Sequence, residues 1–295
     1  MRQRLVVGLI VAFCLAVLVL AVKWSPDTSG SASMVGAGGA IGVVRIEGVL
    51  SGASQGYGGA TQTEEIMEAL REAGKRDDIK AVLIRIDSPG GSAVAAQEIA
   101  REIERLKKKG KPLVASMGDV AASGGYWVAA SCDEIFANPA TTTGSIGVIT
   151  EQVNLEELFS RMGIETEVIK SGSYKDMGSI TRKLSPEERK LLEELVDDVY
   201  QQFLLQVEKG RRGKMSPDEI RTIADGRVMT GNKAKQIGLV DHLGNYYDAL
   251  ERTKELANLS GEPQVIELNP QDPFSKVFSQ LLNSKAILQP YLSIR

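Results

Sequence analysis

Short apolar runs alternate with longer amphipathic segments along residues 41–258, and this alternation restricts the fold more than any other feature. Strands are predicted where apolar and β-branched residues cluster, at residues 41–50, 81–86, 112–116, 134–137, 144–149 and 165–169. Helices are predicted from apolar spacing and capping residues at 63–75, 92–109, 121–131, 154–162, 185–209, 218–224, 233–237 and 247–258. This rhythm predicts one α/β domain with a mostly parallel sheet and covering helices.

The composition excludes several classes of protein. The 295 residues are 43% hydrophobic and 25% charged, which is typical of a globular chain and not of a disordered or collagen-like one. A net charge of −3 gives no electrostatic reason to expect a nucleic-acid partner. The two cysteines, Cys14 and Cys132, cannot build a disulfide framework or a four-ligand zinc site. His242 is the only histidine, so mechanisms that need two histidines are excluded.

Residues 1–23 are predicted to form a transmembrane anchor. The run from Leu5 to Val22 is almost wholly apolar, and as a helix it would span about 27 Å, close to the hydrocarbon thickness of a bilayer. Two arginines precede the run and Lys23 follows it, which favours a cytoplasmic N-terminus and a folded domain on the extracytoplasmic side. A cleavable signal peptide is the alternative, but the apolar run is long for one and lacks a small-residue cleavage site.

Two further segments flank the folded domain of residues 41–258. Residues 24–40 are predicted to be a flexible linker, because Gly, Ser and Ala dominate them. Residues 259–295 form a C-terminal tail, in which the segment from Phe274 to Tyr291 places apolar residues on one helical face. This face is expected to pack on the domain or on a neighbouring subunit, and contact with a membrane surface or with substrate is the alternative.

A turn at residues 87–92 is the first segment with possible chemistry. It reads Asp-Ser-Pro-Gly-Gly-Ser and joins a buried strand to a helix. Its glycines permit positive φ angles and let backbone N–H groups approach a ligand. No Gly-Lys-Ser/Thr follows, so a phosphate loop is excluded, whereas an oxyanion hole fits. An ordinary strand-to-helix turn is the alternative.

Ser123 stands among small residues at a predicted helix start, in the segment Ala121-Ala-Ser-Gly-Gly-Tyr126. Small neighbours would let a substrate backbone reach its hydroxyl, and the N–H of Gly124 beside it is a candidate oxyanion donor. The segment therefore suits a nucleophile. The alternative is a helix N-cap, which is a much commoner role for serine.

Lys175 lies in a polar loop at residues 170–176. A lysine amine has a reference pKa of about 10.4, but burial disfavours its charged form, so a desolvated lysine can take a proton from serine without a histidine. A solvated surface lysine is the alternative interpretation.

Taken together, these segments resemble the signal peptide peptidase A family, whose members are Ser-Lys serine peptidases with the Clp-protease/crotonase fold. The resemblance covers roughly residues 41–245 and rests on D-S-P-G-G, A-S-G-G-Y, T-G-S-I-G at 143–147 and S-G-x-x-K. It implies a short-form serine endopeptidase that needs no metal or cofactor. The implied roles are nucleophile for Ser123, general base for Lys175, orientation of the lysine for Ser145, and oxyanion hole for Gly90 and Gly124.

The resemblance also implies partners and a location. The substrates would be cleaved signal peptides or other unfolded apolar peptides, and the chains would assemble into a ring. Serine and lysine can come from neighbouring protomers or domains in this family, so the resemblance leaves open whether the pair forms within one chain or between chains. Together with the predicted anchor, the resemblance predicts an enzyme in the cell membrane.

Three other interpretations remain at this stage. A crotonase-like acyl-CoA enzyme would share the sheet, and a non-catalytic ring scaffold would need no active site. The third is a Ser-His-Asp triad through His242 and Asp241, which is disfavoured because no histidine occurs between Ser123 and Asp241. Cys132 is expected to be an inert core residue.

Overall fold

The computed structural model describes residues 39–52 and 62–270. The predicted anchor, residues 24–38 of the predicted linker, and the apolar stripe of residues 274–291 lie outside this part of the chain. None of the described helices is at once long enough and apolar enough to span a membrane. The elements below are therefore those of residues 39–52 and 62–270.

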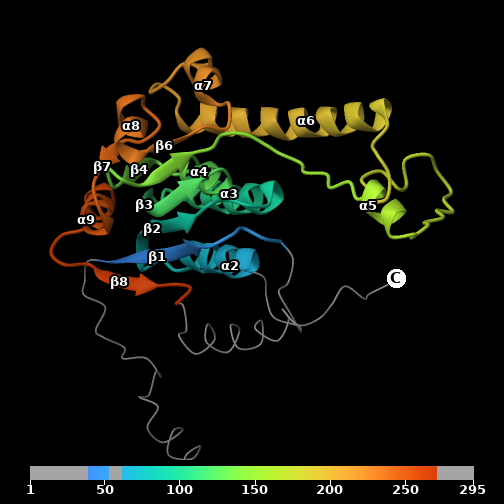
Figure 1. Cartoon of the computed structure of the whole chain (residues 1–295). Coiled ribbons are helices and arrows are strands. Elements are labelled where there is room, and N and C mark those ends of the chain that lie inside the picture. Colours follow the sequence, from blue (N-terminus) through green and yellow to red (C-terminus); the bar gives the residue numbers. More distant parts are fainter. Residues whose placement is uncertain (1–38, 53–61, 271–295) are drawn as a thin grey trace, which may run out of the picture. The chain divides into compact units, whose positions relative to one another are not determined.

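A single sheet forms the centre of the described part (Figure 1). Its strands are β1 (Ala40–Glu47), β2 (Ile79–Ser88), β3 (Leu113–Ala122), β4 (Glu134–Ala137), β5 (Thr142–Gly144), β6 (Val228–Thr230), β7 (His242–Leu243) and β8 (Gln264–Glu267). The order is β6-β5-β3-β2-β1-β8, and β4 pairs with both β3 and β7. Every pairing is parallel except that between β5 and β6.

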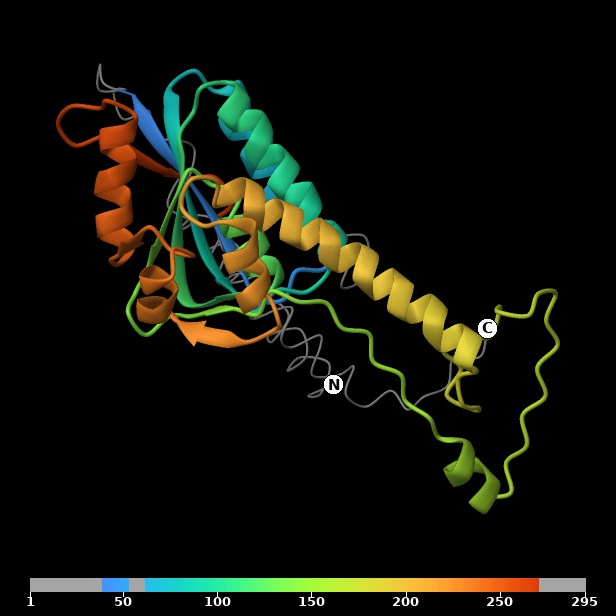
Figure 2. The same ribbon diagram turned by 90° about the horizontal axis from the view of Figure 1, so that it is seen from above.

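Helices cover both faces of the sheet (Figures 1 and 2). They are α2 (Gln62–Lys75), α3 (Ala93–Lys108), α4 (Gly124–Ala129), α5 (Glu156–Arg161), α6 (Pro186–Gly210), α7 (Pro217–Ile223), α8 (Gly231–Gln236) and α9 (Tyr246–Leu256). Along β1, Ile41 and Val43 point towards α9, whereas Val44 and Ile46 join the larger core with α2 and α3. Successive side chains of a strand point to opposite faces of the sheet. Both faces of these strands are apolar because helices cover both. This mixed α/β sheet with covering helices fits the expected Clp-protease-like fold.

The irregularity between β2 and β3 shapes the end of the sheet that precedes Ser123. Ile86 is opposite Met117 but Ser88 is opposite Ala121, so β3 contains extra residues between these pairs. The carboxylate of Asp87 accepts a hydrogen bond from the N–H of Val120 at 3.1 Å and thereby stabilises the irregular stretch. Beyond it, β3 pairs with β5 instead of β4.

Several sequence predictions differ from the observed elements. The strand predicted at residues 165–169 is wrong, because these residues are exposed and pair with no strand in the described part of the chain. The strand predicted at 144–149 is also wrong: β5 ends at Gly144 and the following residues leave the sheet. Residues 121–122 end a strand and do not begin a helix. Short β6, β7 and β8 had no sequence prediction, and β8 lies in the tail.

Residues 149–185, which we call the arm, project from the sheet domain together with the first half of α6 (Figures 1 and 2). Most arm residues are exposed, including the apolar side chains of Ile149, Met162 and Ile169. The second half of α6 is anchored: Phe203 is buried and stacks on Trp127 of α4 with ring centroids 4.7 Å apart. The arm is therefore carried by one long helix that is anchored at its C-terminal half.

Candidate active site

Ser123 directly follows β3 and has an unusual backbone conformation. Its φ is 53° and its ψ is −121°, a region that L-residues rarely adopt and that costs about 1–3 kcal/mol. The N–H of Ser123 donates to the carbonyl of Gly144 at 2.9 Å, and its own carbonyl accepts from Trp127 at 2.9 Å. Its hydroxyl makes no capping hydrogen bond to α4. The N-cap interpretation of this serine is therefore not supported.

The Gly-Gly turn packs directly against Ser123. Gly90 has a φ of 98°, and a Cβ atom placed on it would lie 2.6 Å from the nitrogen of Gly124 and 2.8 Å from the Cβ of Ser123. No side chain fits there. The turn is fixed by Leu50, whose N–H donates to the carbonyl of Gly90 and whose carbonyl accepts from Ser92, both at 2.8 Å.

The backbone N–H groups of this turn differ in availability. The N–H of Gly90 donates to the hydroxyl of Ser88 at 3.1 Å. Within the described residues, those of Gly91 and Gly124 donate to no protein acceptor. They are also neighbours, since a Cβ atom on Gly124 would lie 3.4 Å from the nitrogen of Gly91. The sequence analysis named Gly90 and missed Gly91, which the same Gly-Gly pair contains.

Ser145 lies at the same end of the sheet as Ser123. Ala122 and Gly144 are register partners in β3 and β5, so the two serines follow paired residues. Ser145 has a φ of 52°, and its N–H donates to the carbonyl of Arg227 at 2.8 Å. Two serines with left-handed backbones thus occupy adjacent positions where the parallel strands end.

A groove of about 1310 Å³ runs past both serines. Ser123, Gly91, Gly124 and Ser145 line it at the end of the sheet. Apolar side chains make much of the remaining wall, mainly from α4 and α6: Trp127, Leu192, Leu195, Val196, Val199 and Phe203. Such a groove suits an extended apolar chain with its backbone beside Ser123.

Lys175 is not brought to this groove within one chain. It lies on the arm, its side chain is exposed, and it does not line the groove. Among the hydrogen bonds and ion pairs of the described residues, none joins Lys175 to either serine. The structure therefore brings three of the predicted site residues together: Ser123, Ser145 and Gly124 line the groove. Gly90 packs behind them. Lys175 lies elsewhere, on the arm.

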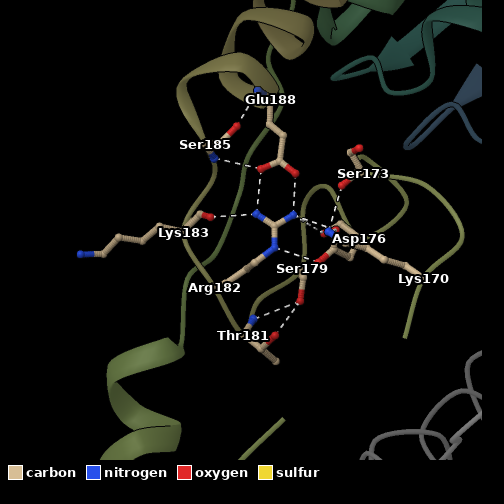
Figure 3. A network of polar contacts seen from close by, with 9 residues as sticks. All are labelled: Lys170, Ser173, Asp176, Ser179, Thr181, Arg182, Lys183, Ser185 and Glu188. Carbon is tan, nitrogen blue, oxygen red and sulfur yellow. Dashed lines mark hydrogen bonds and ion pairs between the residues drawn. The ribbon is translucent and has the colours of Figure 1, made fainter. Parts of the chain in front are cut away.

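The loop that carries Lys175 has its own polar network (Figure 3). Arg182 donates to both carboxylate oxygens of Asp176 at 2.8 Å and to Glu188 at the start of α6. Lys170 donates to Asp176 at 2.6 Å. Hydrogen bonds from Arg182, and then from Lys170, hold the pKa of the Asp176 carboxyl far below its usual range. Sequence analysis did not identify this network, because nothing in the spacing pairs residue 176 with residue 182.

Neither His242 nor Cys132 belongs to the groove. The ring of His242 contacts Glu134 at 3.0 Å and stacks on Phe136, while Asp241 pairs with the buried Arg211 at 3.0 Å. A triad with Ser123 is thus not formed. Cys132 is buried, and burial raises the pKa of its thiol to about 12, which makes it unreactive. In residues 39–52 and 62–270, no three His, Cys, Asp or Glu side chains gather as a metal site.

Comparison with known proteins gives a consistent assignment. The model of peptidase family S49 matches residues 105–260, more than half of the chain. A candidate protease of Synechocystis sp. is 44% identical over 70% of this chain. A candidate signal peptide peptidase SppA of Enterococcus faecium is 39% identical over 69% of it, and the chloroplastic serine protease SPPA of Arabidopsis thaliana is 38% identical over 80%.

The chain spans 73%, 58% and 34% of the lengths of these three relatives, so their activities as whole proteins do not transfer without further argument. The family match and the shared protease names nevertheless agree with the groove and the half-buried serine that lines it. They also agree with the resemblance to signal peptide peptidase A. The chain belongs to peptidase family S49 and is a serine-type peptidase.

Proposed function

We propose that the chain is a membrane-anchored serine endopeptidase in which Ser123 is the nucleophile and Lys175 of another copy is the general base. The observation that carries the proposal is the strained Ser123, whose hydroxyl makes no capping bond and which lies in a groove beside two N–H groups that donate to no acceptor among the described residues. Strain of this kind persists where the surrounding structure maintains it, and it often coincides with catalysis.

The chemistry follows from these groups. The Ser123 oxygen attacks a peptide carbonyl carbon while its proton passes to the neutral amine of Lys175, which gives a tetrahedral intermediate. When the C–N bond breaks, that proton passes to the leaving amine and an ester remains on Ser123. Water then attacks the ester, giving one proton to Lys175, which returns it to the departing Ser123 oxygen. Ser145 would hydrogen-bond to the lysine and orient it.

The oxyanion would be held by the N–H groups of Gly91 and Gly124. We favour Gly91 over Gly90 as the donor because the N–H of Gly90 already donates to Ser88. Gly90 then acts by its lack of a side chain, which lets the turn approach Ser123. Two preorganised N–H donors stabilise the charge that develops on the carbonyl oxygen.

A second copy is needed because Lys175 is exposed on an arm that projects from its own domain. A lysine amine in water is protonated below about pH 10 and is then no base. Docking of the arm against another copy would bury its apolar side chains and remove water from the amine, which favours the neutral form. Assembly into a ring satisfies this requirement for every subunit.

The substrates we propose are cleaved signal peptides or other unfolded apolar peptides, since apolar side chains of α4 and α6 line part of the groove. The apolar segment of residues 5–22 supports an anchor in the cell membrane, with the catalytic domain on the extracytoplasmic side. The family assignment favours peptide hydrolysis over an acyl-CoA reaction. A non-catalytic ring is the alternative that activity measurements must exclude.

The pH dependence of the rate tests the lysine base. We expect kcat/KM for a fluorogenic apolar peptide to rise between neutral and alkaline pH, because the fraction of neutral Lys175 amine increases as protons are lost. A serine-directed phosphonate should label Ser123 with the same pH dependence, as measured by mass spectrometry. A flat profile between about pH 6 and 10 would argue against a lysine base.

Gly90→Ala tests the close approach of the turn to Ser123. The new methyl group would collide with the nitrogen of Gly124 and with Ser123, so we expect kcat/KM to fall by about 100-fold or more. Gly110→Ala is a matched control, because Gly110 also has a positive φ, 76°, but a Cβ atom placed on it would meet no atom within 4 Å. Both variants should lose stability through backbone strain. Equal peptidase activity in the two would contradict this role of Gly90.

A further inference from the structure

We propose that Arg182 is a positioning residue for the general base, because it fastens the loop that carries Lys175 to the first turn of α6. The inference rests on the proposed function, since it concerns where the amine of Lys175 is held. Arg182 itself is not expected to touch substrate: it is absent from the groove wall and lies within the arm.

The guanidinium of Arg182 bridges two carboxylates with two adjacent edges of its planar fork, which share Nη2 (Figure 3). One edge donates from Nε and Nη2 to the two oxygens of Asp176, each at 2.8 Å. The other edge donates to both oxygens of Glu188, from Nη1 at 2.8 Å and from Nη2, and Nη1 also donates to the carbonyl of Lys183 at 3.0 Å. A fork engaged on both edges defines the orientation of its partners more narrowly than a point charge does.

Glu188 provides the rigid end of this connection. Its carboxylate accepts from the N–H of Ser185 at 2.9 Å, and its N–H donates to the Ser185 hydroxyl at 3.1 Å, which forms a capping box on α6. The Glu188 side chain is only 4% exposed. The loop that bears Lys175 is thus tied through Asp176 and Arg182 to the start of a helix of 25 residues.

The same contacts neutralise the acidic neighbour of Lys175. Both oxygens of Asp176 are occupied by Arg182 and Lys170, so the carboxylate is not free to pair with the adjacent lysine. Hydrogen bonds, first from Arg182 and then from the N–H of Ser185, lower the pKa of Glu188 to about 2. The charged side chains of the loop and the first turn of α6 are Lys170, Lys175, Asp176, Arg182, Lys183, Glu187, Glu188 and Arg189.

Losing Arg182 is expected to have two consequences. The loop loses its attachment to α6, so the amine of Lys175 is presented less accurately and kcat falls. With Arg182 gone, only Lys170 still pairs with Asp176, so more of the negative charge of this carboxylate acts on the Lys175 amine, favours its protonated form and moves the alkaline rise of the rate to higher pH. A residue that merely stabilised the fold would not produce this second effect.

The experiment compares the full-length assembled enzyme with its Arg182→Ala variant on one fluorogenic peptide. We expect kcat to fall about 30-fold with little change in KM, and the alkaline rise to move up by about half a pH unit. Adding Asp176→Asn to Arg182→Ala should return the rise to its original pH without restoring kcat. Arg182→Lys keeps the charge but not the fork, so it should lose about 5-fold in kcat. It also decides the question if the alanine variant does not fold.

Arg252→Ala is the matched control. Arg252 makes a comparable two-bond contact with Glu134, at 2.9 and 2.7 Å, but belongs to α9. Its loss should leave kcat and the pH profile unchanged. Wild-type kcat in Arg182→Ala, or in Arg182→Lys if only that variant folds, would overturn the inference. So would a lower thermal midpoint with an unshifted pH profile. Full activity of Ser123→Ala or Lys175→Ala would instead refute the proposed function.

Discussion

Replacing either Ser123 or Lys175 by alanine is expected to reduce kcat for a fluorogenic peptide by roughly 10³–10⁶-fold. Without Ser123 no ester can form, and without Lys175 the serine proton has no acceptor at neutral pH. The two residues act as a unit, so the double variant should be no less active than either single one. Initial rates measured at saturating peptide, with the purified full-length protein, give the comparison.

Lys183→Ala is the control for the lysine. It lies in the same arm, and its side chain points away from the polar network (Figure 3), so its removal should leave kcat within about 2-fold. Assembly should be compared by light scattering, because a variant that failed to assemble would lose activity for another reason. Unchanged activity in both Ser123→Ala and Lys175→Ala would exclude the dyad and favour a non-catalytic ring.

Mixed assemblies of two inactive variants should recover activity. When Ser123→Ala and Lys175→Ala chains are co-expressed, an intact serine of one chain can meet an intact lysine of its neighbour, and random mixing yields about a quarter of the wild-type sites. The reason is the exposed position of Lys175, which no contact joins to Ser123 within the described chain. Activity is measured after the two differently tagged chains are purified in tandem.

The control is co-expression of Lys175→Ala with the double variant Ser123→Ala/Lys175→Ala. No pairing of those chains contains a lysine base, so no activity should appear. If the first mixture is as inactive as this control although both tags co-purify, the dyad must form within one chain. The arm would then have to fold back towards the groove.

The sequence predicted those parts of the fold that depend on local signals. The capping box at Ser185 marks the start of α6, and the helix begins at Pro186 as the sequence implied. Strand β4 matches its predicted limits, because a short apolar run is bounded by polar residues on one side and Asn-Pro on the other. The strand at residues 165–169 failed because β-branched residues favour a strand only where another strand is available for pairing.

The arrangement of the site was less accessible to sequence analysis. The small residues before Ser123 resemble a helix start, but they extend β3 through pairing with Gly144, a long-range contact. In the Gly-Gly pair, the N–H of Gly90 donates to the Ser88 hydroxyl, which leaves the N–H of Gly91 as the candidate oxyanion donor. This hydrogen bond depends on the folded turn and cannot be inferred from the order of the residues. The bridge between Asp176 and Glu188 likewise needs the loop conformation. The catalytic roles themselves remain predictions.

On the proposed pairing of Ser123 with Lys175 of another copy, the separation of the arm from the groove has a consequence for the cell that makes this enzyme. A newly synthesised subunit would hold a nucleophile without a proton acceptor, and would therefore be harmless to the unfolded chains around it. Peptidase activity would appear only when subunits assemble. Unlike the activation of a zymogen, this step would be reversible and would require no cleavage of the chain. Dilution would then silence the protease, and the local concentration of subunits would set its activity.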